Sequence, residues 1–118
     1  CGGFLRAEQG NLKFPTSGSS SYPTEISCGW VIIVNSTKVI NITFSSFNLE
    51  KSTTCSFDWL QIHDGSGADA HMIGRFCGDK LPKNGTIIST RNYLYLWFRS
   101  DHSLVGEGFE LTWNSTEP

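Results

Sequence analysis

The sequence predicts an all-β sandwich, and three observations lead to this fold class. Apolar and polar residues alternate with a period of two along several short segments, as half-buried strands do. Gly, Pro, Asn and Ser separate these segments where turns are needed. No segment keeps the 3.6-residue periodicity of an amphipathic helix over several turns.

Four segments carry the alternation, and each predicts a strand with one face directed to the core. They are KVINITF (38–44), WLQIHDG (59–65), NYLYLWF (92–98) and GFELTW (108–113). The residues predicted to face the core are Ile40, Ile42, Phe44, Leu60, Ile62, Leu94, Leu96, Phe98, Phe109, Leu111 and Trp113. The opposite faces carry Val39, Asn41, Thr43, Tyr93, Tyr95, Trp97, Glu110 and Thr112. Residues 15–25 (PTSGSSSYPTE) predict a loop.

Length and composition predict one domain. We expect this domain to span residues 1–113, with a short tail over 114–118, the bounds that the family resemblance described below implies. Hydrophobic residues make up 38% and aromatics 13%, which is enough apolar surface for a core. The net charge of −2 and the scattered Lys and Arg residues argue against a nucleic-acid partner. No apolar run is long enough to cross a bilayer, so we expect a mature secreted chain or an excised module.

The four cysteines predict two disulfides. Their number is even, and none lies in a CxxC pair or in metal-ligand spacing with a histidine. Pairing nearest neighbours, Cys1 with Cys28 and Cys55 with Cys77, closes two short loops, although the sequence leaves other connectivities open.

Four N-glycosylation sequons support an extracellular location, because glycans are attached in the secretory pathway. The acceptor residues are Asn35, Asn41, Asn84 and Asn114. Asn41 lies on the polar face of its predicted strand, so a glycan there would project away from the core.

Six segments in order resemble the CUB domain, an extracellular module of complement proteases, developmental metalloproteases, endocytic receptors and spermadhesins. The segments are CGGFL, YPTEISCGW, FNLEKSTTCSFDWLQIHDG, IGRFCGDKLP, IISTRNYLYLWFRSD and GEGFELTW, and they span Cys1 to Trp113. The resemblance implies an all-β sandwich of two antiparallel sheets with jelly-roll-like topology, and it supports the nearest-neighbour disulfides. One departure is the Ser-rich run before Tyr22-Pro23, where the family usually has Ser-Pro-X-Tyr-Pro.

The resemblance also implies a calcium site. The calcium-binding branch of the family places a Glu before the third cysteine, an Asp after it and a second Asp late in the chain, positions that Glu50, Asp58 and Asp101 fill here. Calcium takes about six to eight oxygen ligands with irregular geometry, which carboxylates from separate loops can supply. The backbone carbonyls of Asp101 and Ser103 would complete the shell, and Tyr22 would hydrogen-bond a ligand carboxylate.

The function implied is non-catalytic recognition of an extracellular protein. Calcium-ordered loops would present the remaining oxygens of Glu50, Asp58 and Asp101 to a Lys or Arg of the ligand. The parent would be a secreted or cell-surface multidomain protein, with contacts to neighbouring domains. The alternative is a freestanding, spermadhesin-like secreted binder of carbohydrate or protein, and retention of the three acids favours the first hypothesis.

Enzymatic and zinc-binding interpretations are weaker. RSDHS (99–103) contains the residue types of a nucleophilic triad, but adjacent residues point apart. The pair Glu50 and Asp58 resembles the carboxylates of a glycosidase, yet the chain offers no second wall for a cleft. His63 and His71 lack the third and fourth ligands that zinc needs.

Two further hypotheses concern exposed residues. His102 follows Asp101, so its protonation in an acidifying compartment would weaken binding of calcium or a cationic partner. Tyr93, Tyr95 and Trp97, with Trp59 beside them, form an outward aromatic face that either packs against a neighbouring domain or a second copy, or is covered by loops or polar groups.

Overall fold

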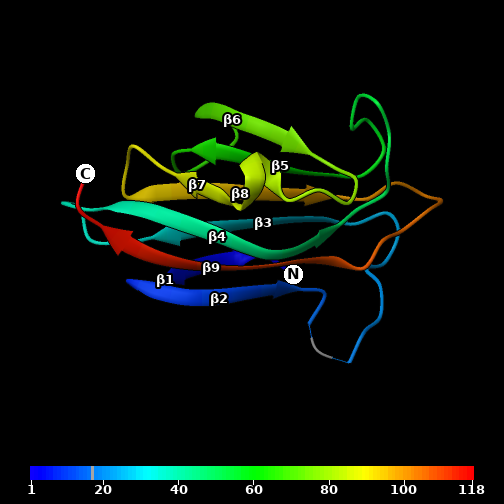
Figure 1. The fold of residues 1–118 in the computed structure, drawn as a ribbon, viewed down its shortest axis with the longest axis horizontal. Helices are drawn as coiled ribbons and strands as arrows, with labels where there is room; N and C mark the ends of the chain where they lie inside the picture. The colour runs from blue at the N-terminus through cyan, green and yellow to red at the C-terminus, as the bar shows by residue number, and fades with distance from the viewer. Residues whose placement is uncertain (17) are drawn as a thin grey trace.

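A computed structural model describes residues 1–16 and 18–118 and shows two sheets packed face to face (Figure 1). The first sheet contains, in order, β1 (Gly3–Arg6), β3 (Ser27–Ile33), β8 (Tyr93–Arg99), β5 (Trp59–Asp64) and β6 (His71–Phe76). The second contains β2 (Gln9–Phe14), β9 (Gly108–Thr116), β4 (Val39–Asn48) and β7 (Thr86–Ile88), with the 3₁₀ turn η1 (Pro82–Gly85) before β7. The predicted all-β sandwich is confirmed. The pairing is antiparallel except between β1 and β3, which run parallel.

The four predicted strands are present as β4, β5, β8 and β9, and β4 and β9 extend several residues further than expected. β4 continues to Asn48 through an irregularity between Phe44 and Ser46. β9 continues to Thr116, and residues 114–116, which the sequence assigned to a tail, pair with the start of β4. A polar sequence such as Asn-Ser-Thr lacks the apolar alternation of a half-buried strand, but its backbone can still join a ladder.

The core lies between the sheets, and every residue predicted to face it is buried. An aromatic cluster fills one part of it: the ring of Phe98 lies 4.9 Å from that of Phe14 and 4.8 Å from that of Tyr22. Tyr22 is 1% exposed although it belongs to the predicted loop over 15–25. It therefore anchors that loop to the core. Ser17, inside the same loop, lies outside the described residues.

Both predicted disulfides are confirmed. Cys1 is bonded to Cys28 and Cys55 to Cys77, and in each pair the Cα atoms are 5.4 Å apart. The first bond ties the N-terminus to β3, and the second joins the segment before β5 to the end of β6. The second bond therefore restrains the segment between Glu50 and Asp58.

Strand directions bring three distant segments to one end of the sandwich. β4 ends, β5 begins and β8 ends there, at the right of Figure 1. We call this the acidic end, because Glu50, Asp58 and Asp101 lie just outside these three strand ends.

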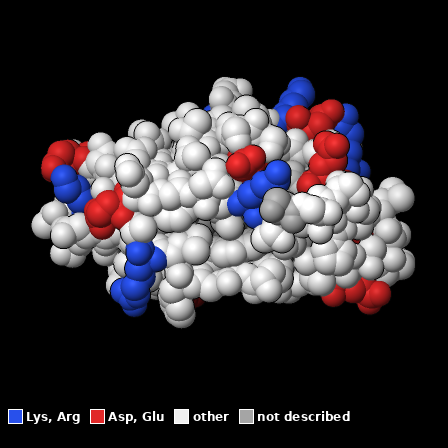
Figure 2. Space-filling view, turned by 90° about the horizontal axis from the view of Figure 1, so that it is seen from below, with Lys and Arg blue, Asp and Glu red and all other residues white. Residues whose placement is uncertain are grey.

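Charged side chains also lie outside the acidic end. On the face shown in Figure 2, Lys, Arg, Asp and Glu gather mainly toward the two ends of the molecule, and much of the middle is uncharged. In the described part of the chain, no helix has the length and apolar character needed to cross a membrane.

Candidate functional site

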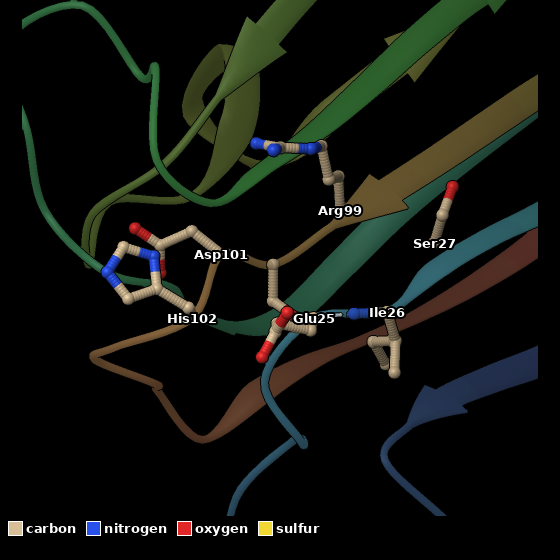
Figure 3. Close-up of a pocket in the computed structure, with 7 residues that line it drawn as sticks. Glu25, Ile26, Ser27, Arg99, Asp101 and His102 are labelled. Carbon is tan, nitrogen blue, oxygen red and sulfur yellow. Dashed lines mark hydrogen bonds between the residues drawn. The ribbon is translucent and has the colours of Figure 1, made fainter.

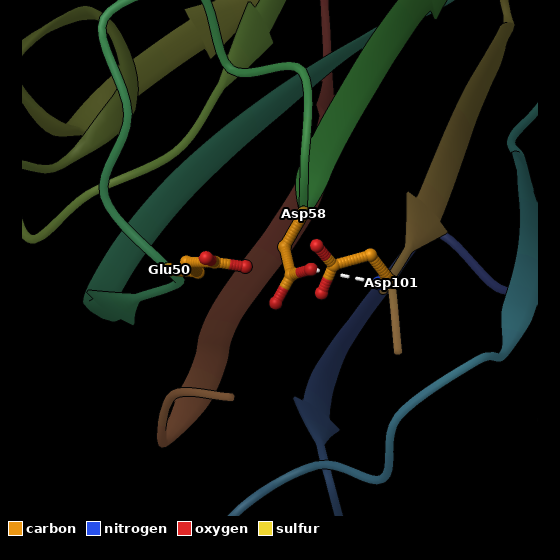
Figure 4. A group of neighbouring side chains, drawn as sticks. All are labelled: Glu50, Asp58 and Asp101. Atoms are coloured by element: carbon orange, nitrogen blue, oxygen red, sulfur yellow. Dashed lines mark hydrogen bonds between the residues drawn. The ribbon is translucent and has the colours of Figure 1, made fainter. Parts of the chain in front are cut away.

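The acidic end brings together the three acids that the sequence singled out. Oxygen atoms of Glu50, Asp58 and Asp101 all lie within 4.8 Å of one another. Figure 4 shows their side chains converging from three separate segments of the chain. Residues more than forty positions apart thus form one cluster, because β5 and β8 are hydrogen-bonded neighbours in the same sheet.

Asp58 is the buried centre of the cluster, with 0% of its surface exposed. The hydroxyl of Tyr22 donates to its Oδ2 at 2.6 Å, and the backbone N–H of Asp101 donates to its Oδ1 at 2.8 Å. Burial raises the pKa of the Asp58 carboxyl above its usual range and the neighbouring Asp101 carboxylate adds to the rise, although the two hydrogen bonds act the other way. The carboxylate is thus held in position, but its negative charge is not neutralised.

Glu50 has an oxygen without a partner. Its Oε1 is buried and has no hydrogen-bond partner among the described residues, while its backbone N–H donates to the Tyr22 hydroxyl at 3.0 Å. The pKa of the Glu50 carboxyl is raised, first by desolvation and then by repulsion from Asp101 and Asp58. A buried acceptor without a donor is costly, and a bound cation would satisfy it.

Asp101 lies at the solvent side of the cluster. Its Oδ1 accepts a hydrogen bond from the backbone N–H of Ser103 at 3.2 Å, and its carbonyl oxygen accepts one from Glu25 at 2.8 Å. Partial desolvation acts to raise the pKa of Asp101. The net pKa is nevertheless lowered by the hydrogen bond from Ser103, by hydrogen bonds within the cluster and by the nearby His102. Ser103 is exposed, and the role assigned to its carbonyl stays a prediction.

The donor set fits a hard divalent cation. None of the three acids forms an ion pair with Lys, Arg or His in the described residues. Carboxylate oxygens without thiol or imidazole neighbours suit calcium rather than zinc. Three converging carboxylates, one with an unsatisfied buried oxygen, are the arrangement that calcium would stabilise.

A shallow pocket of about 320 Å³ adjoins Asp101 (Figure 3). Its lining consists of Glu25, Ile26, Ser27, Arg99, Ser100, Asp101 and His102. In Figure 3 the guanidinium of Arg99 lies apart from the Asp101 carboxylate, and the two groups form no ion pair in the described residues. His102 is exposed in this pocket, and its role as a pH-sensitive group stays a prediction.

The residues considered for catalytic and zinc sites have other surroundings in the described structure. Ser100 is buried, and its Oγ donates to the carbonyl of Pro23 and accepts from the N–H of Ile26, rather than meeting His102. Asp58 is enclosed, so no sugar can lie between it and Glu50. His63 is buried whereas His71 is exposed, and the one cluster of metal-binding groups in the described chain is the acidic one.

The sequons lie away from the acidic cluster. Asn35 follows β3 at the opposite end, and Asn84 lies in η1. Asn41 and Asn114 face each other across β4 and β9, with Asn114 exposed and Asn41 partly buried. Glycosylation at the four sites stays a prediction.

The outward aromatic residues lie on the free face of the five-stranded sheet. Tyr93 is 37% exposed, but Trp59 is only 8% exposed because Arg75 and Arg99 cover its ring. Sequence reasoning did not identify these arginines, since each looks like an ordinary polar residue in its own strand. The alternation in HMIGRF (71–76) was the available signal for a strand carrying Arg75 outward.

Comparison with known proteins gives a consistent assignment. The family model of the CUB domain matches residues 1–113. A cubilin homolog of Drosophila melanogaster is 54% identical over 114 residues, covering 97% of this chain and 3% of the relative. Human procollagen C-endopeptidase enhancer 1 is 40% identical over 116 residues, covering 98% of this chain and 25% of the relative. The chain thus spans a small part of each of these relatives.

A solved structure supports the same assignment. The MASP-1 CUB2 domain bound to Ca²⁺ superposes with a TM-score of 0.81 and 25% sequence identity, covering 97% of this chain and 99% of that domain. The two chains therefore share the sandwich described above.

Proposed function

Because this chain belongs to the CUB domain family, we propose that it is a calcium-stabilised module that binds a basic side chain of an extracellular protein. CUB domains are generally extracellular protein-interaction modules. The two disulfides agree with an extracellular location. The proposal adds the ion and the ligand chemistry to that general role.

The convergence of Glu50, Asp58 and Asp101 carries the proposal. Their carboxylates would hold the ion, with the backbone carbonyls of Asp101 and Ser103. Tyr22 would orient Asp58 from behind. The MASP-1 CUB2 domain, whose structure contains Ca²⁺, is a precedent for the ion in this fold.

Calcium would supply positive charge that neutralises the cluster and orders the loops carrying these acids. Asp101, which faces solvent, would keep oxygen lone pairs available to a ligand cation. A Lys or Arg side chain entering from the pocket side would meet charge-assisted hydrogen bonds, which are strong and sensitive to salt. Ligand binding is therefore expected to require calcium.

Calcium titration of the isolated chain tests the metal site. We expect the melting temperature to rise with calcium in the wild type and in Asp69→Asn, an exposed acid outside the cluster, but not in Asp101→Asn. Calorimetry would give the affinity. A calcium-dependent rise in Asp101→Asn equal to that of the wild type would contradict the site.

The ligand is tested next by nuclear magnetic resonance with a short lysine peptide and a norleucine peptide as the matched control. We expect shifts around residues 101–103 with the lysine peptide, in calcium only. Shifts that persist in excess chelator, or that both peptides produce, would overturn the ligand chemistry.

The spermadhesin-like alternative, a freestanding binder, would be favoured by carbohydrate binding that is independent of calcium.

A further inference from the structure

The free face of the five-stranded sheet is positively charged. We define this arginine face by the residues that alternate with the core positions of β1, β3, β8, β5 and β6. They are Phe4, Arg6, Val31, Ile33, Tyr93, Tyr95, Trp97, Arg99, Trp59, Gln61, His63, Met72 and Arg75. The five strands contain one acidic residue, Asp64, which is buried and accepts hydrogen bonds from Thr90. The face thus carries three cations in a chain whose net charge is −2.

Two of these arginines share one aromatic ring. The Cζ atom of Arg75 lies 3.9 Å from the centre of the Trp59 ring, and that of Arg99 lies 4.9 Å from it. They reach Trp59 from β6 and β8, the two strands that flank β5. The electron-rich face of an indole attracts a guanidinium group. This attraction holds two positive charges close together without a carboxylate between them.

Buried polar side chains hold Arg75 in place. Its Nε donates to Oε1 of Gln61 at 2.8 Å, and the amide of Gln61 donates to Nε2 of His63, also at 2.8 Å. A carbonyl oxygen can only accept a hydrogen bond, so the ring proton of His63 lies on Nδ1, which donates to the carbonyl of Ala70 at 3.0 Å. Gln61 is 6% exposed and His63 is 3% exposed. The surface arginine is thus oriented before any ligand arrives.

The cluster offers hydrogen-bond donors and lacks an acceptor. In the described part of the chain, the terminal nitrogens of Arg75 have no hydrogen-bond partner, and the buried indole N–H of Trp59 has none either. Arg99 donates to the carbonyl of Phe57 at 3.2 Å, and its guanidinium lies apart from the carboxylates of Glu25 and Asp101 (Figure 3), with neither of which it forms an ion pair in the described residues. A ligand that supplies acceptors, above all a planar carboxylate, matches this set.

Exposed apolar residues share this face with the arginines: Met72 lies on β6 with Arg75, whereas Phe4 lies on the edge strand β1 and Tyr93 lies at the other end of β8 from Arg99. Phe4 is 72% exposed, Met72 46% and Tyr93 37%. Arg, Trp, Tyr and Met are the residue types enriched in protein interfaces. No sequon lies in the five strands, whereas Asn41 and Asn114 lie in the other sheet. Glycans on that sheet would leave the arginine face open.

We infer that the arginine face docks a segment of another extracellular protein that presents Asp or Glu carboxylates among apolar side chains. Arg75 and Arg99 on Trp59 are the anchor for a carboxylate, and the exposed apolar residues contact its neighbours. A sulfated polysaccharide fits less well, because it is charged along its whole length and this face adjoins the acidic end. A second copy in like-to-like contact would bring the same positive charges together. This inference does not depend on calcium.

A binding selection on the full 118-residue chain tests the inference. The labelled chain is incubated in calcium buffer with beads that each carry a random peptide about twelve residues long, and the beads that bind it are sorted. Binding of heparin and self-association of the chain are measured in parallel. We expect selected peptides to combine Asp or Glu with apolar residues. Arg75→Gln and Arg99→Gln should each weaken their binding about tenfold. Arg91→Gln, which removes the same charge outside the five strands, should leave binding unchanged.

Several outcomes would overturn the inference. They are a selection without binders, selected peptides that are not enriched in carboxylates, and selected peptides that bind Arg75→Gln as tightly as the wild type. Arginine-dependent binding of heparin in place of peptides would assign the face to a polysaccharide. A concentration-dependent dimer that both arginine substitutions abolish would assign it to a second copy. Circular dichroism melting confirms that each variant is folded.

Discussion

Tyr22 connects the hydrophobic core to the acidic cluster. Its ring packs edge-on against Phe98, and its hydroxyl both donates to Asp58 and accepts from the backbone N–H of Glu50. Burial and the hydrogen bond to Asp58 raise the pKa of this hydroxyl, so it stays protonated as a donor. One side chain thereby positions two of the three acids.

Replacing Tyr22 by Phe tests this connection. The change keeps the ring but removes the hydroxyl, which leaves buried polar groups without a partner. We expect the free energy of unfolding to fall by about 1–3 kcal/mol and calcium affinity to drop. Urea denaturation and calorimetry measure the two effects. Tyr93→Phe, at an exposed position, is the control, and equal behaviour of the two variants would contradict the role of Tyr22.

At the scale of elements, the segment between β8 and β9 packs closely against the backbone of neighbouring strands. A Cβ on Gly106 would lie 2.4 Å from the carbonyl oxygen of Asn48, and one on Gly108 would lie 1.9 Å from that of Phe14. Gly108 also has a φ of +101°, which other residues rarely adopt. The start of β9 therefore depends on glycine, and the carbonyl of Gly106 accepts the backbone N–H of Tyr22.

Gly108→Ala is expected to lower the free energy of unfolding by about 3–5 kcal/mol, through both the backbone strain and the contact with Phe14. Thermal and urea unfolding measure the loss. Gly67→Ala is the matched control, because the nearest atom to its added Cβ is a flexible carboxylate oxygen of Asp69 at 3.3 Å. If both alanine variants unfold alike, the steric explanation fails.

At the scale of the whole molecule, the acidic cluster makes stability depend on pH in opposite ways with and without calcium. The pKa values of Glu50 and Asp58 are raised in the folded state, by burial and then by neighbouring carboxylates. The folded chain therefore takes up protons at a higher pH than the unfolded chain does. Between neutral pH and the ordinary carboxyl pKa of about 4, acidification favours the folded state. The lowered pKa of Asp101 acts the other way, below that range.

We therefore expect the cluster to make the calcium-free chain more stable at about pH 5.5 than at about pH 7. Calcium needs ionised carboxylates, so its added stability should shrink over the same range. Urea unfolding with and without calcium measures both trends. Glu50→Gln is the control, since it removes one of the titrating groups and should flatten the calcium-free profile. A calcium-free profile with the same slope in wild type and Glu50→Gln would contradict this account.

The alternation of apolar residues was sufficient to predict four strands and their buried faces, because side-chain direction in a strand is a local property. The same pattern missed the last residues of β9, where polar side chains still pair. Glu50, Asp58 and Asp101 were identified through a family resemblance. Nothing in their local sequence shows that they meet.

The tertiary structure alone shows which side chains lie next to one another. Contacts across a sheet depend on strand order and register, and these arise from the packing of the whole chain. The order β8-β5-β6 brings Arg99 and Arg75 to Trp59, and the common end of β4, β5 and β8 brings the three acids together. A linear sequence indicates which residues face outward, but the neighbours of each one exist only in the tertiary structure.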